Sequence, residues 1–530
     1  MKQNNFLLII LILSSVLLFT NLGDRTLFGD EAFTVIVAKT ITEGGYPSSY
    51  YGDFLINPKD TSNFKIGDKD VYTWNTWTQY YIANGIYSIF GLNEFALRVP
   101  FVLIGLATIC LLYFFTKKLT NDETIARFAT IILALSVPFV LHIKQVRWYA
   151  LVSFFTLAVC YSYWLFINEE ESKEKSSALF FFTLSCIWLF YSNLLTFFGI
   201  MVAVTSHFFV FRVLNLNKKL LKKMIISLLI TAFCTAPWFF ITGQLSKLSG
   251  ASMSIKSIVF NIALYWYYAF VLLIPALFLL IFLFKKHRKE LFQPNYVFIM
   301  FIIVVFICFS ALKVDHLPAI RYIICLTPLF CILNAYVIVK IKEYNKFLGY
   351  IILMILIMSN LLHTLPIMPL GKFANGIDAN VSDYEKERFI TSSTELKFPL
   401  VNYINEITHD YEGTEEAIIN YINKHKGNND TFTTSHFENV FILHNDMRYI
   451  PPDKIEIGDE PDWIIKRNFK INEFELGIFD EQVKSSLNMS DYKLIEINSL
   501  DEMWEGSPDP ISHRYRTDKN GVVYIYRKID

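Results

Sequence analysis

Ionisable side chains gather in three short stretches of the sequence, each next to a long apolar run. The stretches are "FGDEAFT" with Asp30 and Glu31, "HIKQVRWY" with His142, Lys144, Arg147 and Tyr149, and "KVDHLPAIRY" with Lys313, Asp315, His316, Arg321 and Tyr322. Charged side chains at membrane depth are costly, and they usually face a cavity or one another. We therefore expect these residues to lie together at one end of a helical bundle and to form a functional site.

The residue types in these stretches fit one kind of chemistry. A carboxylate such as Asp30 can take a proton from an acceptor hydroxyl, and arginine or lysine can hold a phosphate as its charge grows. A lipid phosphate at the membrane surface would suit this arrangement. Two plainer alternatives stay open. Adjacent acids are common in solvated loops, and arginines such as Arg98, Arg147 and Arg321 often only anchor a helix at the headgroups.

The composition places the chain in a membrane. Of its 530 residues, 53% are hydrophobic and 18% are charged, against about 25% charged in ordinary soluble proteins. The formal net charge is zero, which argues against a nucleic-acid partner, because proteins that bind nucleic acid carry a basic face. No Cys-x-x-Cys or His-Glu-x-x-His motif is present, so no cofactor is indicated. A divalent metal at the acid pair and the histidines stays open, although the arginines could compensate the same charge.

Eleven apolar runs predict membrane spans, each of which needs about 20 residues or somewhat fewer where neighbours help. They cover residues 5–21, 96–115, 124–141, 149–167, 178–192, 194–212, 224–242, 261–284, 295–312, 319–339 and 347–365. The boundary between the fifth and sixth runs is the least defined, because only a short turn divides them. The first run has one preceding lysine, as a signal peptide does, but no small-x-small cleavage site, so we expect an uncleaved span.

Lysine and arginine in the short loops set the orientation. Alternate loops hold most of the lysines, which makes those loops cytoplasmic. The long loop 22–95 and the tail from about residue 366 then lie outside. The long loop also carries aromatic residues suited to the membrane interface, namely Tyr72, Trp74, Trp77, Tyr80 and Tyr81.

Residues 366–530 predict a soluble domain. The segment "GTEEAIINYINKHKG" has helical spacing, with Thr414 as an N-cap and Gly427 as a stop. The segments "DTFTTS", "DWIIKR", "YKLIEI" and "GVVYIYRK" predict strands. The expected fold class is therefore a polytopic α-helical membrane protein with about 11 transmembrane helices in residues 1–365. An extracytoplasmic α/β or α+β domain follows in residues 366–530.

Four segments resemble a known family in their order and spacing. They are "FGDEAFT" after the first run, "LNEFALRVPFVLIGLATICLLYFFTKKLT" through the second, "VRWYALVSFFTLAV" opening the fourth and "RYIICLTPLF" opening the tenth. The chain resembles the GT-C type of lipid-linked-sugar glycosyltransferases, in the branch of protein O-mannosyltransferases and aminoarabinose transferases. The resemblance covers about residues 1–365 and, more weakly, the tail.

The resemblance implies an inverting membrane glycosyltransferase of GT-C-like fold. It would move a single sugar from a polyprenyl-phosphate donor to an acceptor hydroxyl on the extracytoplasmic face. By the same resemblance, Asp30 is the catalytic base, Glu31 supports it, and Arg321 lies near the donor phosphate. The other candidates for substrate binding are Tyr322, Arg147, Tyr149, Lys313 and His316. Arg98 matches an arginine of the family for which a structural role is the simpler interpretation.

Two departures and two alternatives accompany this resemblance. Many relatives carry a Pro-Pro stretch where this chain reads "KDVYTWNTWTQYY", so Lys69 is not assigned to a phosphate. The Trp-Trp-Asp signature of oligosaccharyltransferases is absent, which argues against transfer of a whole oligosaccharide. A transporter or flippase for lipid-linked glycans is one alternative, although no internal repeat is evident. A polymerase or ligase for surface polysaccharide is the other.

The sequence does not name the sugar or the acceptor, because specificity depends on cavity shape rather than on a readable motif. The acceptor is a protein, a lipid or a polysaccharide of the cell envelope. We expect a multi-pass protein of a prokaryotic plasma membrane, surrounded by membrane lipid.

Overall fold

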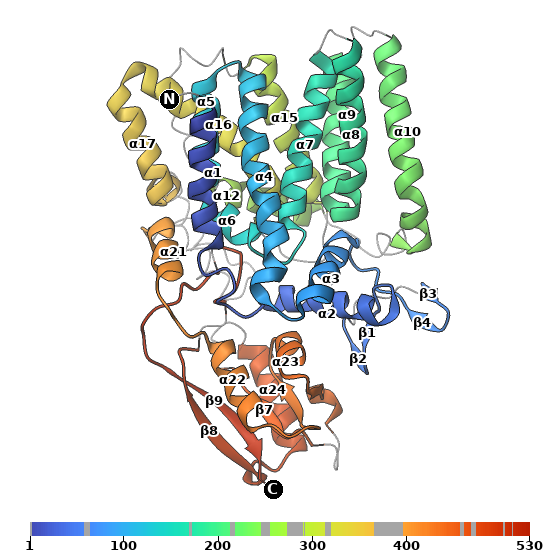
Figure 1. Cartoon of the computed structure of the whole chain (residues 1–530), viewed down its shortest axis with the longest axis vertical. Helices are drawn as coiled ribbons and strands as arrows, with labels where there is room; N and C mark the ends of the chain where they lie inside the picture. The colour runs from blue at the N-terminus through green and yellow to red at the C-terminus, as the bar shows by residue number, and fades with distance from the viewer. Residues whose placement is uncertain are drawn as a thin grey trace.

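The computed structural model describes residues 3–57, 64–168, 172–212, 218–244, 255–272, 290, 292–312, 320–364, 396–455, 460–467, 473–501, 504–510 and 512–529. A bundle of long helices forms one part of the molecule and a smaller domain with a sheet forms the other (Figure 1). Helices of the first loop lie between the two parts. This end of the bundle, which faces the sheet domain, is called the domain end below.

The helices of the bundle follow the apolar runs of the sequence. They are α1 (Gln3–Phe19), α4 (Glu94–Thr120), α5 (Glu123–Ala134), α6 (Val137–Ile143), α7 (Tyr149–Asn168), α8 (Ser172–Ser192), α9 (Leu194–Arg212), α10 (Lys218–Ile241), α12 (Ile255–Leu272), α15 (Pro294–Ser310), α16 (Thr327–Tyr344), α17 (Lys346–Met358) and α18 (Leu361–Thr364). Short polar side chains cap several of them. The Ala96 N–H donates to Asn93 at the start of α4, for example. Helices α8 and α9 are separated by Asn193 alone, so the short turn expected there is confirmed.

The number of spans is only partly confirmed. Among the described residues, α4, α7, α9, α10 and the stretch Ile324–Tyr344 are long and apolar enough to cross a membrane. The pair α5 and α6 makes a sixth if it counts as one span, and α1, α15 and α17 are apolar but shorter. A multi-pass helical membrane protein is therefore confirmed, whereas the predicted count of eleven is not.

Two predicted spans differ from straight helices in a way that matters for the site. α5 and α6 meet at an angle of 61°. Pro138 lies in the first turn of α6, where its missing N–H costs nothing. α6 ends at Ile143 and so delivers residues 144–148 to the domain end. Before α16, the chain runs through the 3-10 turns η3 (Ile320–Tyr322) and η4 (Ile324–Leu326), so the helix predicted from residue 319 begins at Thr327.

The first loop is folded rather than extended along the bundle. Its elements are α2 (Gly29–Gly44), α3 (Thr78–Phe90) and two hairpins, β1 (Tyr50–Tyr51) with β2 (Phe54–Leu55) and β3 (Lys65–Ile66) with β4 (Lys69–Asp70). α2 packs against α3 and against α23 (Glu438–Asn445) of the sheet domain, and it lies across the domain end of the bundle (Figure 1). The helix ends at Gly44, and the C-cap that follows is Gly45, whose left-handed φ of 81° glycine adopts readily.

The C-terminal domain is built on a sheet with the strand order β6-β5-β7-β9-β8. The strands are β5 (Thr431–Thr434), β6 (Arg448–Tyr449), β7 (Trp463–Ile465), β8 (Tyr492–Asn498) and β9 (Val522–Lys528), and the helices are α21 (Pro399–Thr408), α22 (Thr414–His425), α23 (Glu438–Asn445) and α24 (Glu473–Ser486), with 3-10 turns η5 (Pro452–Lys454) and η6 (Met489–Asp491). β5 pairs in parallel with β6 and β7, while β9 is antiparallel to β7 and β8. All four predicted strands and the predicted helix are present.

The start of α22 differs from its prediction by one residue. Gly413 is the N-cap, and Thr414 is the first residue of the helix. Thr414 is buried, and its hydroxyl donates to the Leu500 carbonyl instead of capping α22. A buried hydroxyl needs such a partner. A threonine before two acidic residues predicts an N-cap. The sequence does not reveal that Thr414 is buried against the segment that contains Leu500.

Candidate active site

The acid pair opens helix α2. Phe28 is the N-cap, so Asp30 and Glu31 are the second and third residues of the helix. The Phe28 N–H donates to Glu31 Oε2 at 3.1 Å. The partial positive charge of a helix N-terminus favours both carboxylates. Successive helical residues point about 100° apart, and the two acids accordingly enter different surroundings.

Asp30 lies between two arginines that come from distant parts of the chain. Its Oδ2 is 3.4 Å from Arg321 Nη1 in the η3 turn and 3.6 Å from Arg147 Nη2 in the segment after α6. Arg147 also donates to Thr34 Oγ1 at 3.2 Å, one turn further along α2. Charge-assisted bonds normally measure about 2.7–2.9 Å. The contacts of Asp30 are longer, so its carboxylate is oriented without being fully saturated.

Solvent reaches the same three residues unequally. The side chains of Asp30 and Arg321 are 34% and 38% exposed, while that of Arg147 is only 10% exposed. Arg147 is therefore fixed in the protein, with its guanidinium also lying over the Phe33 ring at 5.9 Å. Asp30 and Arg321 form the accessible face of the cluster, where a substrate could approach.

The arginines hold Asp30 in its charged form. Burial by itself would raise its pKa, but the guanidinium groups of Arg147 and Arg321 outweigh that effect, with a smaller contribution from Tyr149. The pKa of Asp30 is consequently lower than the ordinary 3.8. The carboxylate is ionised at neutral pH, as a general base must be before it accepts a proton.

Glu31 is buried and fully paired. Its carboxylate accepts Arg98 Nε at 3.0 Å, Arg98 Nη2 at 2.8 Å and the Val146 N–H at 2.9 Å, in addition to the Phe28 N–H. Arg98 also donates to the carbonyls of residues 22, 25 and 26 at 2.8–3.0 Å. The pair thus ties together α4, the segment before α2 and the segment that carries Arg147. Its geometry is that of a support beneath the site.

Two tyrosines of the first loop lie near the acid-arginine cluster, and their surroundings differ from those that the sequence predicted. Tyr72 and Tyr80 are fully buried, so the interpretation of these two as residues of the membrane interface is wrong. Tyr72 packs edge-on against Phe33 at 5.5 Å, Tyr80 packs edge-on against Tyr72, and both phenols accept from Asn75 at 3.4 Å. The aromatic density of the segment was visible in the sequence, but the packing of α2 and α3 that buries it was not.

The structure describes some of the other predicted site residues and leaves others outside the described residues. Tyr149 is buried beside the site, with its ring edge-on to that of His142 at 5.0 Å. The Arg321 guanidinium lies 5.3 Å from the Tyr322 ring. His142 contacts the Pro138 carbonyl through Nδ1 at 2.7 Å, an intrahelical bond of α6. Lys313, Asp315 and His316 lie outside the described residues.

A trio of carboxylates close enough to hold a metal occurs elsewhere in the described residues. Glu415, Glu416 and Glu505 place one ligand atom each within 4.8 Å of the others. Their negative charge faces arginines, since Arg467 binds Glu415 at 3.0 Å and Arg516 binds Glu416 at 2.5 Å. Asp30 is not part of this group. The trio therefore has counter-charges within the protein itself.

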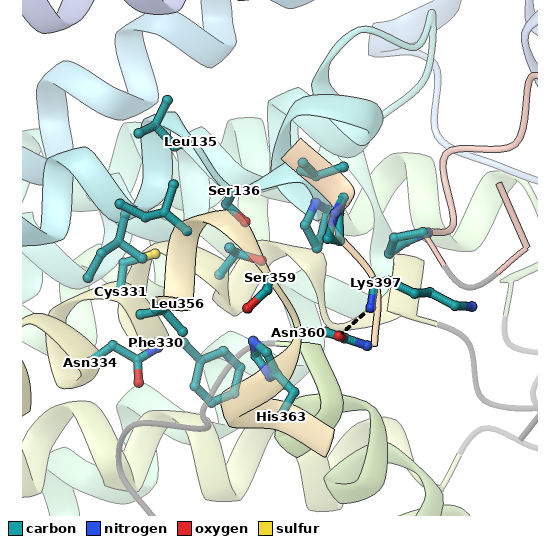
Figure 2. A pocket seen from close by; sticks show the side chains of 17 residues that line it. Leu135, Ser136, Phe330, Cys331, Asn334, Leu356, Ser359, Asn360, His363 and Lys397 are labelled. Carbon is teal, nitrogen blue, oxygen red and sulfur yellow. Dashed lines mark hydrogen bonds between the residues drawn. The ribbon is translucent and has the colours of Figure 1, made fainter. Parts of the chain in front are cut away.

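A separate pocket of about 110 Å³ lies beside the break between α5 and α6. Its apolar wall includes Leu135, Phe330 and Leu356, and Asn360, His363 and Lys397 line its polar side (Figure 2). The Lys397 N–H donates to Asn360 Oδ1 at 2.7 Å. The residues of this pocket do not include Asp30, Arg147 or Arg321, so it is distinct from the acid-arginine cluster.

One protein family and several solved structures are similar to this chain. A family model described as dolichyl-phosphate-mannose-protein mannosyltransferase matches residues 77–239. ArnT from Cupriavidus metallidurans, in crystal structures bound to undecaprenyl phosphate and in the apo state, has 10% sequence identity and a TM-score of 0.54, with 99% of this chain and 98% of that chain covered. The oligosaccharyltransferase AglB from Archaeoglobus fulgidus has 10% identity and a TM-score of 0.49 over 90% of this chain and 71% of that chain. No curated protein sequence matches significantly.

The fold and the family match confirm the predicted resemblance. The similarity to ArnT spans nearly all of both chains, so the chain has the fold of ArnT. The family match covers the stretch from α3 into α10, which includes Arg147 and Tyr149. A glycosyltransferase activity is therefore the one to propose for this chain.

Proposed function

We propose that the protein transfers a single sugar from a polyprenyl-phosphate donor to an acceptor hydroxyl, with inversion at the anomeric carbon and with Asp30 as the general base. The observation that carries this proposal is the convergence of Asp30, Arg147 and Arg321 at the domain end of the bundle. The description of the matching family names a dolichyl-phosphate sugar, and the similar ArnT was solved with undecaprenyl phosphate bound. Both support a lipid-linked donor.

The proposed step follows from what each side chain can do. Asp30 accepts the proton of the acceptor hydroxyl while the acceptor oxygen bonds to the anomeric carbon. The bond between that carbon and the phosphate oxygen breaks, and its electron pair leaves with the lipid phosphate, which gains one negative charge. Arg321 is 38% exposed and lies 3.4 Å from Asp30, so its guanidinium would stabilise that charge. Arg147 is buried and keeps Asp30 aligned.

The remaining substrate-binding candidates keep distinct roles in this proposal. Tyr149 packs against His142 and Tyr322 lies beside Arg321, and both would shape the space for the sugar. Lys313 and His316 stay candidates for the donor phosphate on the strength of the sequence alone. Glu31 acts as a positioning residue for its neighbour rather than as a second base, because its carboxylate already accepts four N–H groups.

The proposed side of transfer is the extracytoplasmic face of the plasma membrane. The lysine-rich loops of the sequence are assigned to the cytoplasm, and the first loop and the C-terminal domain lie together at the domain end (Figure 1). Residues 1–365 would then form the catalytic membrane domain, and residues 366–530 would be the extracytoplasmic domain. The acceptor would be a protein, a lipid or a polysaccharide of the envelope.

Mass spectrometry of lipid extracts and surface glycans tests this proposal. The cells compared carry wild-type protein, no protein, Asp30→Asn, or Asp53→Asn, a matched control at an exposed acid of the same loop. We expect the null and Asp30→Asn cells to lose the same single sugar and to accumulate a polyprenyl-phosphate sugar, while Asp53→Asn cells match the wild type. Restoration of the glycans by Asp30→Asn would reject Asp30 as the base and favour a transporter or flippase. Loss of a whole repeat unit would favour a polymerase or ligase.

A further inference from the structure

The segment that leads into the catalytic helix is held by the C-terminal domain almost residue by residue. Asp24 Oδ2 is 3.3 Å from Arg516 Nη1, and Arg25 Nη2 is 2.5 Å from Glu406 Oε1. The Thr26 N–H donates to Glu416 Oε1 at 2.6 Å. Each of these partners lies beyond residue 400. Arg516 and Glu416 belong to the sheet domain, whereas Glu406 lies on α21, which packs against α6 and α17 of the bundle.

The last two residues before Asp30 enter an aromatic cluster of that domain. The Phe28 ring lies edge-on to Phe437 with a centroid distance of 5.3 Å, and it is 6.3 Å from Trp504. Phe437 and Trp504 are 6.1 Å from each other, also edge-on. Aromatic pairs at these separations stabilise beyond the area they bury, by about 0.5–1.5 kcal/mol each. Phe28 is thus the single first-loop member of a three-ring cluster, here called the aromatic clamp.

Two glycines make the close approach of the clamp possible. A Cβ on Gly29 would lie 2.7 Å from Cδ1 of Phe437, and a Cβ on Gly506 would lie 2.9 Å from Cβ of Phe28. Both distances are shorter than atoms tolerate, so each position accepts only glycine without movement. Phe437 itself has φ +60° and ψ +36°, a left-handed conformation that is rare for a bulky residue and persists only where packing imposes it.

We propose that Phe437, Trp504 and Gly506 are positioning residues for Asp30, so that the C-terminal domain completes the catalytic site by fixing the first turn of α2. This inference rests on the proposed function. Phe28 and Gly29 directly precede Asp30, whose carboxylate must meet Arg147 and Arg321 in the orientation described. A displacement of about 1 Å at a reacting group can cost about 100-fold in rate. The clamp would prevent that displacement.

The test perturbs the clamp from opposite directions in the full-length protein. Phe437→Ala removes the ring that covers Gly29, and Gly506→Ala wedges a methyl group against Phe28. Phe437→Tyr is the conservative variant. Phe54→Ala is the matched control, because it removes another aromatic contact of the first loop with the same domain, 5.9 Å from Tyr449 on β6. Membranes from null cells expressing each variant contain the native donor and acceptor, so the initial rate of glycan formation per folded protein can be measured directly.

We expect Phe437→Ala and Gly506→Ala to transfer about 100-fold more slowly, while Phe437→Tyr and Phe54→Ala stay within about twofold of the wild type. Binding of undecaprenyl phosphate, followed by native mass spectrometry, should stay unchanged, because Arg321 is untouched. The acid limb of the rate should also move to higher pH in the two slow variants, since Asp30 loses its alignment with Arg147 and Arg321 next to Tyr149. A merely structural defect would not move that limb.

Wild-type rates in both Phe437→Ala and Gly506→Ala would overturn the inference. An equal loss of undecaprenyl phosphate binding and of transfer would also overturn it, because the clamp would then act on the donor site. If Phe437→Ala fails to fold, the transfer rates of Gly506→Ala and Trp504→Leu test the inference in its place. Failure of the proposed function has a different signature, since Asp30→Asn would then keep transfer.

Discussion

Asp30 and Glu31 are neighbours in the chain, yet they occupy opposite kinds of environment. Glu31 is buried and accepts four N–H groups at 2.8–3.1 Å. Asp30 is 34% exposed, and its two arginine partners lie at 3.4 and 3.6 Å. One carboxylate is thus saturated by the protein, and the other is oriented but left with capacity for a further partner.

The contrast teaches how to separate a supporting acid from a reacting one. A buried ion pair that is fully hydrogen-bonded resists the loss of either member, because the remaining charge would be stranded. A partly exposed carboxylate whose contacts with its arginines are long can accept a proton and release it again. The same helix turn would therefore supply both the proposed base, Asp30, and its proposed support, Glu31. Each can be removed separately by mutation.

The largest effect is expected from breaking the support. Glu31→Gln leaves the Arg98 guanidinium buried without its counter-charge, which should lower the free energy of unfolding by about 3–5 kcal/mol. Denaturant titration of the purified protein in detergent measures this loss. The double variant Glu31→Gln with Arg98→Met should recover part of it, because no buried charge remains. Equal stability of Glu31→Gln and the wild type would contradict the assignment of Glu31 as a structural acid.

The second effect concerns the exposed arginine. Arg321→Ala removes the group proposed to stabilise the departing phosphate, so transfer should fall by about 100- to 1000-fold, which is the usual cost of one oriented electrostatic group. Thermal unfolding should hardly change, because Arg321 is 38% exposed and its side-chain contacts are long. Initial rates in isolated membranes measure the effect. Rates within threefold of the wild type would show that another cation serves the phosphate.

The meeting of Asp30 with the arginines could be predicted from the sequence, because their residue types and their positions at span ends already pointed to one end of the bundle. The supporting role of Glu31 was implied only by the family resemblance, and its partners could not be predicted. It depends on Arg98 and on the Val146 N–H, which only tertiary packing brings together. Periodicity also predicted the strands of the C-terminal domain, since each has its own hydrophobic pattern.

Contacts between remote segments left no trace in the sequence. The aromatic clamp joins Phe28 to Phe437 and Trp504, and no spacing rule links residues so far apart. The burial of Tyr72 and Tyr80 escaped prediction for a related reason, since aromatic residues beside a membrane suit both an interface and a core. In this structure, the packing of α2 and α3 buries both tyrosines in the core.

A third carboxylate sharpens the comparison through its pH dependence. Glu406 is buried and pairs with Arg25 at 2.5 Å and with His513 at 3.1 Å. Burial would raise its pKa, but the charge of Arg25 and the contact with His513 lower it to about 2 from 4.5. A depressed folded-state pKa means that the stabilisation is complete above about pH 4.5 and is lost as the pH falls toward 2.

Glu406→Gln should therefore lower stability by about 2–3 kcal/mol at pH 7. The difference from the wild type should shrink between pH 5 and pH 3. Thermal unfolding of both proteins across this range is the measurement. A difference that stays constant with pH would mean that the charge of Glu406 is not what stabilises the domain interface.

The smallest effect separates charge from geometry at the buried arginine. Arg147→Lys keeps a cation beside Asp30 but loses the planar fork that also reaches Thr34 at 3.2 Å. We expect about a 10-fold loss of transfer, the equivalent of one charge-assisted hydrogen bond. Thr34→Val, which removes only the hydroxyl, serves as the control and should lose less. If Arg147→Lys were inactive, we would conclude that Arg147 contacts the donor directly rather than only aligning Asp30.

The central claim is that the two adjacent acids divide the labour, with Asp30 as the base and Glu31 as its support. The most direct measurement compares Asp30→Asn with Glu31→Gln, each for the initial rate of sugar transfer per folded protein and for the melting temperature. We predict that Asp30→Asn loses about 1000-fold in rate with its melting temperature unchanged, and that Glu31→Gln melts far lower while its folded fraction keeps measurable transfer. Full transfer by Asp30→Asn, or an inactive Glu31→Gln that melts like the wild type, would contradict the account.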